Sequence, residues 1–316
     1  MRGLPKHKHA IVRRKDSPNR RIIGKEPSKT GANESGVAMK NQDARSDALK
    51  VWLATFAPEY GLALESLTPA SADASYRRYF RIHADSGKTF IVMDAPPDKE
   101  AIGPYLKVQS LMHDAGMNVP VIYEKDEAAG FILMSDLGQK TYLDVLNSDN
   151  APSLLDAAVD ELIFWQKATR PGVLAPYDET ILRRELNLFP EWYIARHRGY
   201  TMTEKEKTDL QNLFSRIIID NLSQETVYVH RDYMPRNLMV SEGDLPGVID
   251  FQDALIGPIS YDIASLMRDA FISWPEEFVL DMTIRYWEKA RRAGLAVPAD
   301  FGAFWRHVEW MGLQRH

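Results

Sequence analysis

The sequence predicts an α+β protein with two lobes, a β-rich N-terminal lobe and a mainly helical C-terminal lobe. Short apolar segments separated by turn residues concentrate before residue 137, and long apolar stripes at helical spacing follow Thr141. With 316 residues, 45% apolar and 26% charged, the chain can bury a substantial core. The predicted division is a disordered basic extension over 1–42, an N-terminal lobe over 43–137 and a C-terminal lobe over 138–316.

The predicted N-terminal lobe opens with an amphipathic helix and continues mainly as strands. Leu49, Trp52, Leu53 and Phe56 lie on one side of this helix. A turn over 85–88 separates two apolar runs and predicts a hairpin. The remaining predicted elements are the hairpin strands 76–83 and 89–93, a helix over 101–115 that Gly116 ends, and strands over 119–123 and 131–134.

The predicted C-terminal lobe consists mainly of helices with recognisable start signals. Apolar residues over 154–163 form one continuous stripe. Thr203 and Glu206 have the spacing of a capping box, and Ser273 and Glu276 repeat that spacing before a second predicted helix. These helices are interrupted by short apolar runs that predict strands over 226–229 and 247–249.

Composition limits the compartment and the chemistry. The chain contains no cysteine, so it has no disulfide, no thiolate zinc site and no thiol nucleophile. No apolar run approaches the roughly 20 residues that cross a bilayer, and the polar N-terminus shows no secretory signal. We therefore expect a cytoplasmic protein that does not contact a membrane. The last predicted helix reaches His316 without a stop signal, so the chain is expected to end inside an element.

The net charge of −5 conceals a basic N-terminal extension. Residues 1–40 contain eleven Lys or Arg and three acids, so their balance is +8 and the rest of the chain carries −13. Two interpretations are open, an arm that binds nucleic acid or a membrane, and an extension with no role in the fold. No aromatic residue is interleaved with these charges to stack on bases, so we favour the second and expect no nucleic-acid partner.

The most informative run of the chain is His230-Arg231-Asp232-Tyr233-Met234-Pro235-Arg236-Asn237. Thirteen residues after Asn237, Asp250 follows an apolar strand. An Asp, an Asn five positions later and an Asp behind a strand are the layout of a phosphoryl-transfer site. Asp232 is expected to take the proton of the attacking hydroxyl, and the oxygens of Asn237 and Asp250 are expected to hold Mg²⁺ on the phosphates of ATP.

Two residues close to this run are expected to have structural roles. His230 stands beside a catalytic Asp, where a second base is conceivable, but in this pattern it more often packs and hydrogen-bonds to hold the loop. Asp262 stands at the start of a predicted helix, where it can cap backbone amides or tether the catalytic run.

The run resembles the aminoglycoside phosphotransferase family, which has a protein-kinase-like fold. The downstream Gly257-Pro258 and Tyr261-Asp262 are similar to the pattern that follows the metal-binding Asp of that family. Four segments resemble one subgroup, the anomeric kinases that phosphorylate N-acetylmuramate and N-acetylglucosamine at C1 in peptidoglycan recycling. They are 71–81, 93–97, 137–143 and 183–193. The resemblance covers roughly residues 43–316 and implies ATP, Mg²⁺ and a small amino sugar; we also expect a monomer.

For the nucleotide, the resemblance implies a turn over the phosphates and a linker that receives the adenine. The turn falls at 71–75 and contains no glycine, so the Ser75 hydroxyl and backbone N–H groups are expected to contact phosphate oxygens. The linker falls at Leu133-Met134-Ser135-Asp136, so Met134 and Asp136 are expected to contact the nucleotide. A plain core role for Met134 remains open.

The strand on which the family usually carries a phosphate-pairing lysine reads Phe90-Ile91-Val92-Met93-Asp94, without a lysine. We expect Arg78, or its neighbour Arg77, to supply the positive charge, and Glu100 is a candidate for the orienting acid. Both arginines are equally consistent with charges on a strand surface. The missing lysine is also the main support for an alternative, a non-catalytic pseudokinase module that binds nucleotide.

Acceptor selection is expected from the segment over 185–193. Glu185 offers a carboxylate for sugar hydroxyls and Trp192 offers an aromatic face for C–H bonds, although an amphipathic helix packed on the core would look similar. A polycationic aminoglycoside calls for many acids, whereas a lactyl-bearing sugar calls for a base such as Arg236. This favours an amino-sugar acid, and kinases of aminoglycosides or other small hydroxyl compounds remain the alternative.

Overall fold

The computed structural model describes residues 12–13, 44–70, 76–241, 243 and 245–315. The described residues divide into two compact units. The N-terminal unit comprises 44–70, 76–103 and Pro120–Asp136, and the C-terminal unit comprises 12–13, Pro104–Val119 and 137–315. In the part of the chain that the structure describes, no helix combines the length and apolar character needed to cross a membrane.

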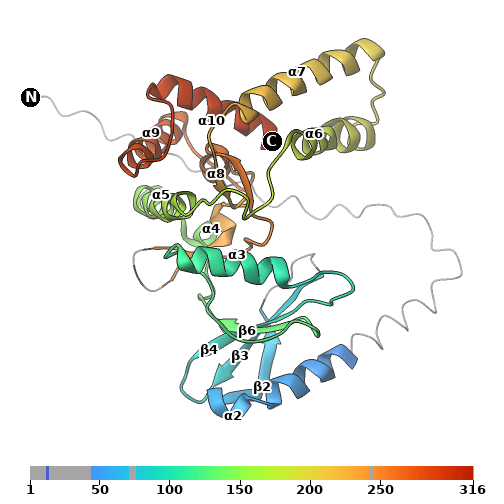
Figure 1. Ribbon diagram of the computed structural model, residues 1–316, viewed down its shortest axis with the longest axis vertical. Coiled ribbons are helices and arrows are strands. Elements are labelled where there is room, and N and C mark those ends of the chain that lie inside the picture. The colour runs from blue at the N-terminus through green and yellow to red at the C-terminus, as the bar shows by residue number, and fades with distance from the viewer. Residues whose placement is uncertain (1–11, 14–43, 71–75, 242, 244, 316) are drawn as a thin grey trace, which may run out of the picture. The chain divides into compact units, whose positions relative to one another are not determined.

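The N-terminal unit is a five-stranded antiparallel sheet with helices at its start. The strand order is β2-β3-β4-β6-β5. A helix over 44–54 and the short α2 precede the sheet in the chain (Figure 1). The bounds are α2 Ala57–Tyr60, β2 Leu62–Pro69, β3 Arg78–Ala84, β4 Thr89–Asp94, β5 Ile122–Asp126 and β6 Phe131–Ser135.

The core of the N-terminal unit lies between its first helix and one face of the sheet. Leu49 and Leu53 of the helix are fully buried against Ile82, Val92 and Leu133. In each strand the core residues stand two positions apart, because every second side chain of a strand faces the same side. They are Ile82 and Ala84 in β3, Phe90 and Val92 in β4, and Phe131 and Leu133 in β6. The helix, the hairpin over β3 and β4, and β6 are confirmed near their predicted positions.

Two strands of this sheet differ from the sequence prediction. β2 was not predicted, because its sequence, Leu-Ala-Leu-Glu-Ser-Leu-Thr-Pro, lacks regular alternation, and its pairing with β3 shifts register between Ala63 and Thr68. β5 begins at Ile122 rather than at Val119, since Val119 and Pro120 lie before the ladder with β6.

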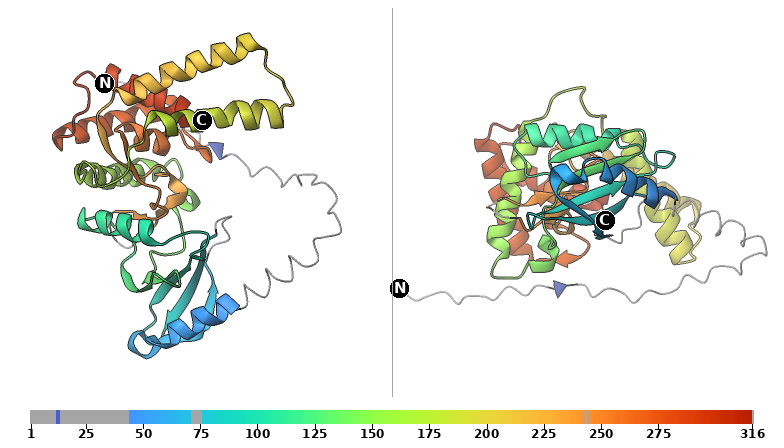
Figure 2. Two further views of the ribbon diagram at one scale, coloured as in Figure 1. Left: turned by 45° about the vertical axis from the view of Figure 1, so that its right-hand side comes forward. Right: turned by 90° about the horizontal axis from the view of Figure 1, so that it is seen from below.

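The C-terminal unit is mainly helical and contains short strands around the catalytic run. Helix α9 packs on α5 and on α10, and α6 and α7 pack side by side (Figures 1 and 2). The helices are α3 Gly103–Asp114, α4 Tyr142–Val145, α5 Ala151–Lys167, α6 Glu179–Leu188, η1 Phe189–His197, α7 Glu204–Leu222, η2 Pro235–Asn237, α8 Tyr261–Met267, α9 Glu276–Arg292 and α10 Phe301–Arg315. The strands are β1 Val12–Arg13, β7 Thr226–Val229, β8 Leu238–Met239, β9 Gly247–Val248, β10 Leu255–Pro258 and β11 Ile272–Ser273.

One of the two predicted capping boxes is confirmed and the other is wrong. The Thr203 side chain accepts the Glu206 N–H, and the Glu206 carboxylate accepts the Thr203 N–H, so α7 starts as predicted. Helix α9 begins after Pro275 and has no side-chain cap. Ser273 instead belongs to β11, where it pairs with Val12. This contact between distant segments removes Ser273 from the helix start.

Candidate active site

The catalytic run lies between two pairs of short antiparallel strands in the C-terminal unit. β7 pairs with β10 and leads directly into His230. β8 pairs with β9, and β9 ends at Val248, two residues before Asp250. Asn237 closes the single turn η2 between the two pairs and is 6% exposed. The loops that follow β7 and β9 therefore carry the two predicted carboxylates, and the turn between them carries the predicted amide.

Hydrogen bonds bring Asp232, Asn237 and Asp250 together at one site. The Asn237 Nδ2 group donates to the Asp232 carbonyl oxygen at 2.9 Å and faces Asp250 Oδ2 at 3.4 Å. The Ile249 N–H group donates to the Asn237 carbonyl oxygen at 3.1 Å, which holds the loop before Asp250 against η2. The side chains of Asp232 and Asp250 stay accessible, since 46% of the Asp232 side chain is exposed and Asp250 is also exposed.

The donor set at this site fits Mg²⁺ held together with phosphate. The Asn237 amide nitrogen is used within the site, and no donor among the described residues occupies its Oδ1 atom. Asp250 Oδ1 accepts only the side-chain amide of Gln252, at 3.0 Å. Elsewhere in the described ranges no three His, Cys, Asp or Glu are grouped to hold a metal. Two protein oxygens supplemented by phosphate and water suit Mg²⁺, which rarely has an all-protein cage.

Left-handed backbone occurs on both sides of this site. Arg231 has φ 77° and Asp250 has φ 64°, and no other non-glycine residue of the described chain has a positive φ. Such conformations cost on the order of 1–3 kcal/mol and persist only where the surroundings hold them. Such outliers cluster at active sites and ligand clamps, so their position next to Asp232 and at Asp250 supports the predicted site.

The buried carboxylate of Asp262 holds the strained backbone. Its Oδ2 atom accepts the His230 N–H at 2.7 Å, and its Oδ1 atom accepts the Arg231 N–H at 3.0 Å. Burial raises the pKa of the Asp262 carboxyl, while the nearby His230 and these two N–H groups act in the opposite direction. Asp262 thus has the contacts of a tether, one of the two roles predicted for it.

His230 joins the two loops of the site and is 1% exposed. Its Nδ1 atom faces the Asp232 N–H at 3.2 Å and its Nε2 atom faces the Ile249 carbonyl at 3.1 Å. A neutral ring with its hydrogen on Nε2 satisfies both contacts. These contacts belong to a residue that holds backbone, and they leave neither ring nitrogen for substrate.

Glu185 lies beside the catalytic run, in a cluster with an arginine and two tyrosines. One carboxylate oxygen accepts Arg231 Nη2 at 2.6 Å, and the other accepts the Tyr177 hydroxyl. Burial and then Tyr261 and Glu185 raise the pKa of the Tyr177 hydroxyl, so it stays a neutral donor. Both oxygens of Glu185 therefore have protein partners, and a direct sugar contact of Glu185 stays a prediction. Tyr177 was missed by the sequence, since no motif relates it to the run.

The other two residues predicted to contact the acceptor are exposed. Trp192 lies in η1, a π-helix without buried residues, and is 54% exposed. The Arg196 guanidinium lies 3.8 Å from the centre of the Trp192 ring. Arg236 is exposed, and its guanidinium lies 5.1 Å from the Phe271 ring. The sequence did not predict the π-helix. Turns of π-helix are frequent at functional sites.

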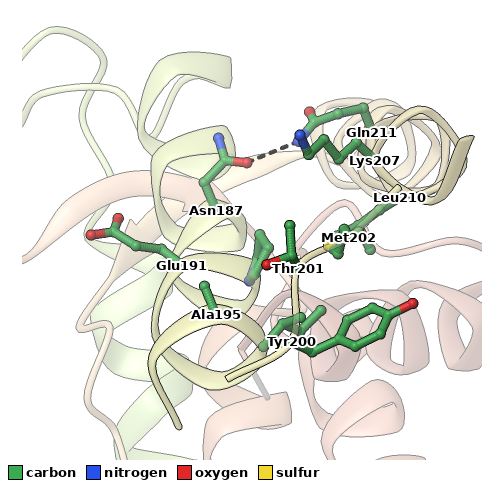
Figure 3. Close-up of a pocket in the computed structure, with 11 residues that line it drawn as sticks. Asn187, Glu191, Ala195, Tyr200, Thr201, Met202, Lys207, Leu210 and Gln211 are labelled. Atoms are coloured by element: carbon green, nitrogen blue, oxygen red, sulfur yellow. Dashed lines mark hydrogen bonds between the residues drawn. The ribbon is translucent and has the colours of Figure 1, made fainter. Parts of the chain in front are cut away.

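A pocket of about 580 Å³ lies between η1 and the start of α7 (Figure 3). Asn187 and Gln211, which are hydrogen-bonded at 3.0 Å, line one side of it, and Glu191 and Tyr200 also contribute. None of the three residues of the phosphoryl-transfer pattern lines this pocket. It is therefore separate from the site around Asp232.

The arginines predicted for the nucleotide have partners inside the N-terminal unit. Arg78 donates through Nε to the buried carboxylate of Asp94 at 2.9 Å, and Arg45 donates to the same carboxylate at 2.6 Å. Arg77 instead forms an ion pair with Glu100 at 2.6 Å. Arg77 and Arg78, which are both candidates for the phosphate contact by sequence, therefore pair with different acids in the structure.

The remaining nucleotide predictions have different outcomes. Asp136 forms a two-pronged contact with Arg81, with Nε to Oδ2 at 2.5 Å and Nη2 to Oδ1 at 3.1 Å. Met134 is buried in β6, opposite Ile91 and Ile122. Ser75 lies outside the described residues.

The β-sheet unit, the helical unit and the Asp–Asn–Asp site together define a phosphotransferase of kinase-like fold. The profile of the phosphotransferase enzyme family (APH) matches residues 66–297, and the chain belongs to this family. The chain is similar to the N-acetylmuramate/N-acetylglucosamine kinase of Neisseria meningitidis serogroup B, with 50% identity over 86% of this chain and 81% of the relative. The protein of the same name from Pseudomonas aeruginosa is 47% identical over 87% of this chain and 83% of the relative.

Solved structures support the fold. An ADP-bound aminoglycoside phosphotransferase APH(2'')-Ib has a TM-score of 0.55 and 15% identity, covering 83% of this chain and 96% of that chain. An amicoumacin kinase complex with AMP-PNP, Ca²⁺ and Ami has a TM-score of 0.60 and 16% identity, covering 88% of this chain and 86% of that chain. The predicted α+β kinase-like fold is confirmed.

Proposed function

We propose that this chain transfers the γ-phosphoryl group of ATP to the C1 hydroxyl of N-acetylmuramate or N-acetylglucosamine. The observation that carries the proposal is the meeting of Asp232, Asn237 and Asp250 at one site. The names of relatives at 45–50% identity support the amino-sugar acceptor. The proposal includes a role in peptidoglycan recycling in the cytoplasm, because ATP and the recycled sugars are both present in that compartment. It also includes a monomeric enzyme.

Asp232 acts on the acceptor hydroxyl. Its carboxylate accepts a hydrogen bond from the C1 hydroxyl and takes the proton as the new oxygen–phosphorus bond forms. The bond from the γ-phosphorus to the bridging oxygen breaks, and ADP leaves with that electron pair. Asn237 and Asp250 would hold the Mg²⁺, which neutralises charge on the phosphate oxygens. Positioning and charge neutralisation carry this chemistry, because the protein forms no covalent bond to the phosphoryl group.

The nucleotide requires positive charge that the strand β4 does not supply. Both arginines are ion-paired, but Arg78 shares the fully buried Asp94 carboxylate with Arg45, whereas the partner of Arg77, Glu100, is 30% exposed. Arg77 pairs with Glu100. A phosphate-binding cation that is oriented by an acid requires such a pair. We therefore assign the phosphate contact to Arg77, in place of the earlier preference for Arg78.

The acceptor is assigned to exposed groups of the C-terminal unit. The half-exposed Trp192 ring suits the apolar face of a pyranose, because an aromatic face packs against C–H bonds. Arg236 follows Asp232 by four residues and offers a cation for the lactyl carboxylate of N-acetylmuramate. Glu185 acts indirectly, through Arg231 of the catalytic run.

The test is product identification by ³¹P NMR. The chain is incubated with ATP, Mg²⁺ and one acceptor at a time: N-acetylmuramate, N-acetylglucosamine, kanamycin and choline. We expect a new phosphomonoester signal coupled to the anomeric proton, only with the two amino sugars. Asp232→Asn should lower kcat by roughly 10²–10⁴-fold and keep ATP binding, because it removes the proton acceptor alone.

Three results would contradict this proposal in different ways. Turnover of kanamycin or choline alone would remove the amino-sugar acceptor and keep the kinase. A phosphomonoester on another hydroxyl would remove the C1 position. ATP binding without any turnover, unchanged in Asp232→Asn, would indicate a non-catalytic nucleotide-binding module.

A further inference from the structure

Arg315 reaches the catalytic run from the far end of the chain. It is the last described residue of α10, 84 positions after Arg231. Its Nη1 group donates to the Arg231 carbonyl oxygen, and its Nη2 group lies 3.7 Å from Asp232 Oδ1. The Arg315 side chain is 11% exposed, so this guanidinium is largely withdrawn from water beside the predicted proton acceptor.

Several contacts hold the end of α10 in this place. The neighbouring Gln314 is buried and donates through Nε2 to the Leu182 carbonyl of α6 at 3.0 Å. The Arg315 guanidinium lies 4.7 Å from the centre of the buried Tyr261 ring. Helix α10 also packs on α8. The guanidinium is therefore fixed by its surroundings rather than by the Asp232 carboxylate alone.

The donors of Arg315 are only partly used by other groups. Its Nη1 group is anchored on a backbone carbonyl, and its Nε group is buried without a hydrogen-bond partner among the described residues. The Nη2 group faces Asp232 at a distance longer than a hydrogen bond, so the attraction is electrostatic. Withdrawing this guanidinium from water costs free energy, which its bond to the Arg231 carbonyl and its attraction to Asp232 offset.

The two carboxylate oxygens of Asp232 therefore have different surroundings. Oδ1 faces the Arg315 guanidinium, whereas Oδ2 has no hydrogen bond or ion pair with any described residue. A proton acceptor works best when one oxygen lies in line with the hydroxyl and the carboxylate does not rotate. Asp232 has no other side-chain partner among the described residues that would prevent this rotation.

We propose that Arg315 is a positioning residue for phosphoryl transfer, which holds Asp232 by Oδ1 so that Oδ2 accepts the acceptor's proton. This inference rests on the proposed function, since it requires Asp232 to act on a hydroxyl. Through the Arg231 carbonyl, Arg315 also restrains the left-handed residue that precedes Asp232. The run from His230 to Asn237 therefore depends on a side chain that no local motif contains.

The test is a double-mutant cycle between Arg315→Met and Asp232→Asn, with kcat and both KM values measured. We expect Arg315→Met to lower kcat by roughly 10–100-fold, because small misplacements of a catalytic group have effects of this size. The KM values for ATP and sugar should change less than about threefold. In the Asp232→Asn background the same substitution should change the remaining rate less than about twofold, because Arg315 acts through Asp232.

Two further variants guard against a folding defect. Arg315→Lys keeps a cation and should retain an intermediate kcat. Arg315→Ala should regain part of its rate when guanidinium chloride is added at millimolar concentration, and not when sodium chloride is added. The matched control is Arg268→Met, which also loses a guanidinium between α8, α9 and α10. That guanidinium pairs with Glu276 and Glu309 and lies over the Trp305 ring. The control variant should leave kcat unchanged below its unfolding temperature.

Equal losses of rate in both backgrounds, or no rescue by guanidinium in a folded Arg315→Ala, would show that Arg315 only supports the fold. A large KM change with unchanged kcat would also overturn the inference in favour of a binding role. The failure of the proposed function is visible separately, because it appears in the wild-type chain as missing turnover of amino sugars. Any other acceptor that the wild-type chain turns over can replace them in the cycle.

Discussion

The carboxylate of Asp262 accepts the backbone N–H of Arg231 at 3.0 Å, and Arg231 has left-handed backbone. The two residues are 31 positions apart, and Asp262 also accepts the N–H of His230. A fully buried acid at the start of α8 therefore compensates backbone strain immediately before Asp232. This couples the geometry of the proton acceptor to a helix that contains no predicted catalytic residue.

Replacing Asp262 by Ala should therefore affect both stability and turnover. Two buried N–H groups lose their acceptor, so we expect the free energy of unfolding to fall by about 2–4 kcal/mol. We expect kcat to fall at least tenfold, because Arg231 can relax and shift Asp232. Urea unfolding and initial rates measure the two effects. Asp281→Ala, which removes an exposed ion pair with Arg285, is the control and should change stability by less than about 1 kcal/mol.

Replacing Asp250 by Asn should weaken the response to Mg²⁺. The variant keeps the shape of the side chain and removes the charge that would balance the cation, so we expect the Mg²⁺ concentration for half-maximal rate to rise at least tenfold. Asp253→Asn removes an exposed carboxylate three residues away and should leave this concentration unchanged. Equal Mg²⁺ responses of the two variants would remove Asp250 from the proposed metal site.

Replacing Arg77 and replacing Arg78 should have different effects on ATP binding and on stability. Arg77→Met should raise the KM for ATP by roughly tenfold, because it removes a charge assigned to phosphate. Arg78→Met should leave that KM within about threefold and lower the free energy of unfolding by roughly 1–3 kcal/mol, because Asp94 keeps only Arg45. Steady-state kinetics with varied ATP and urea unfolding make the comparison. The reverse pattern would restore Arg78 as the phosphate-binding residue.

Replacing Trp192 by Ala should affect the acceptor and not the nucleotide. We expect the KM for the amino sugar to rise by roughly tenfold and the KM for ATP to stay constant, because an aromatic face in contact with the sugar contributes about 1 kcal/mol or more. Ile219→Ala, an exposed apolar position on α7, is the control. An unchanged sugar KM in Trp192→Ala would place the acceptor away from η1.

Glu161 predicts a pH dependence of stability. It is fully buried in α5, burial raises its pKa to about 7, and the Asn118 N–H, at 2.6 Å from its Oε1, lowers it only in part. The folded-state pKa lies above the unfolded value of 4.5, so the native state holds the proton longer. The contribution of Glu161 to the free energy of unfolding is therefore fully present below about pH 4.5. It falls by about 3 kcal/mol as the pH rises towards 7 and changes little above that pH.

The isosteric change Glu161→Gln should remove this slope, because the amide oxygen still accepts the Asn118 N–H and cannot ionise. Urea unfolding of both proteins at pH 5 and pH 8 measures the difference, with the exposed Glu277→Gln on α9 as control. We expect the glutamine variant to be more stable than wild type at pH 8. Parallel pH profiles of the two proteins would show that Glu161 is not the titrating group.

Local features of the chain could be predicted because their causes are local. The capping box of Thr203 and Glu206 depends on residues three apart, and the apolar stripe of α5 depends on a period of about 3.6 residues. The order of a sheet unit and a helical unit follows from such patterns. The spacing of Asp232, Asn237 and Asp250 likewise predicted residues that lie together, because short loops and one turn bring them to one place.

The sequence by itself thus determined the fold class and the family, and it predicted three oxygen-bearing residues that the structure brings together. Only the tertiary structure decided which groups support them: Asp262 and Arg315 around the catalytic run, the engagement of Glu185 with Arg231 and Tyr177, and the separation of Arg77 from Arg78. It also decided that Ser273 pairs with Val12 instead of capping a helix. The physical reason is that ion pairs and buried hydrogen bonds join residues that packing brings together from distant parts of the chain. No periodicity along the sequence indicates which residues these are.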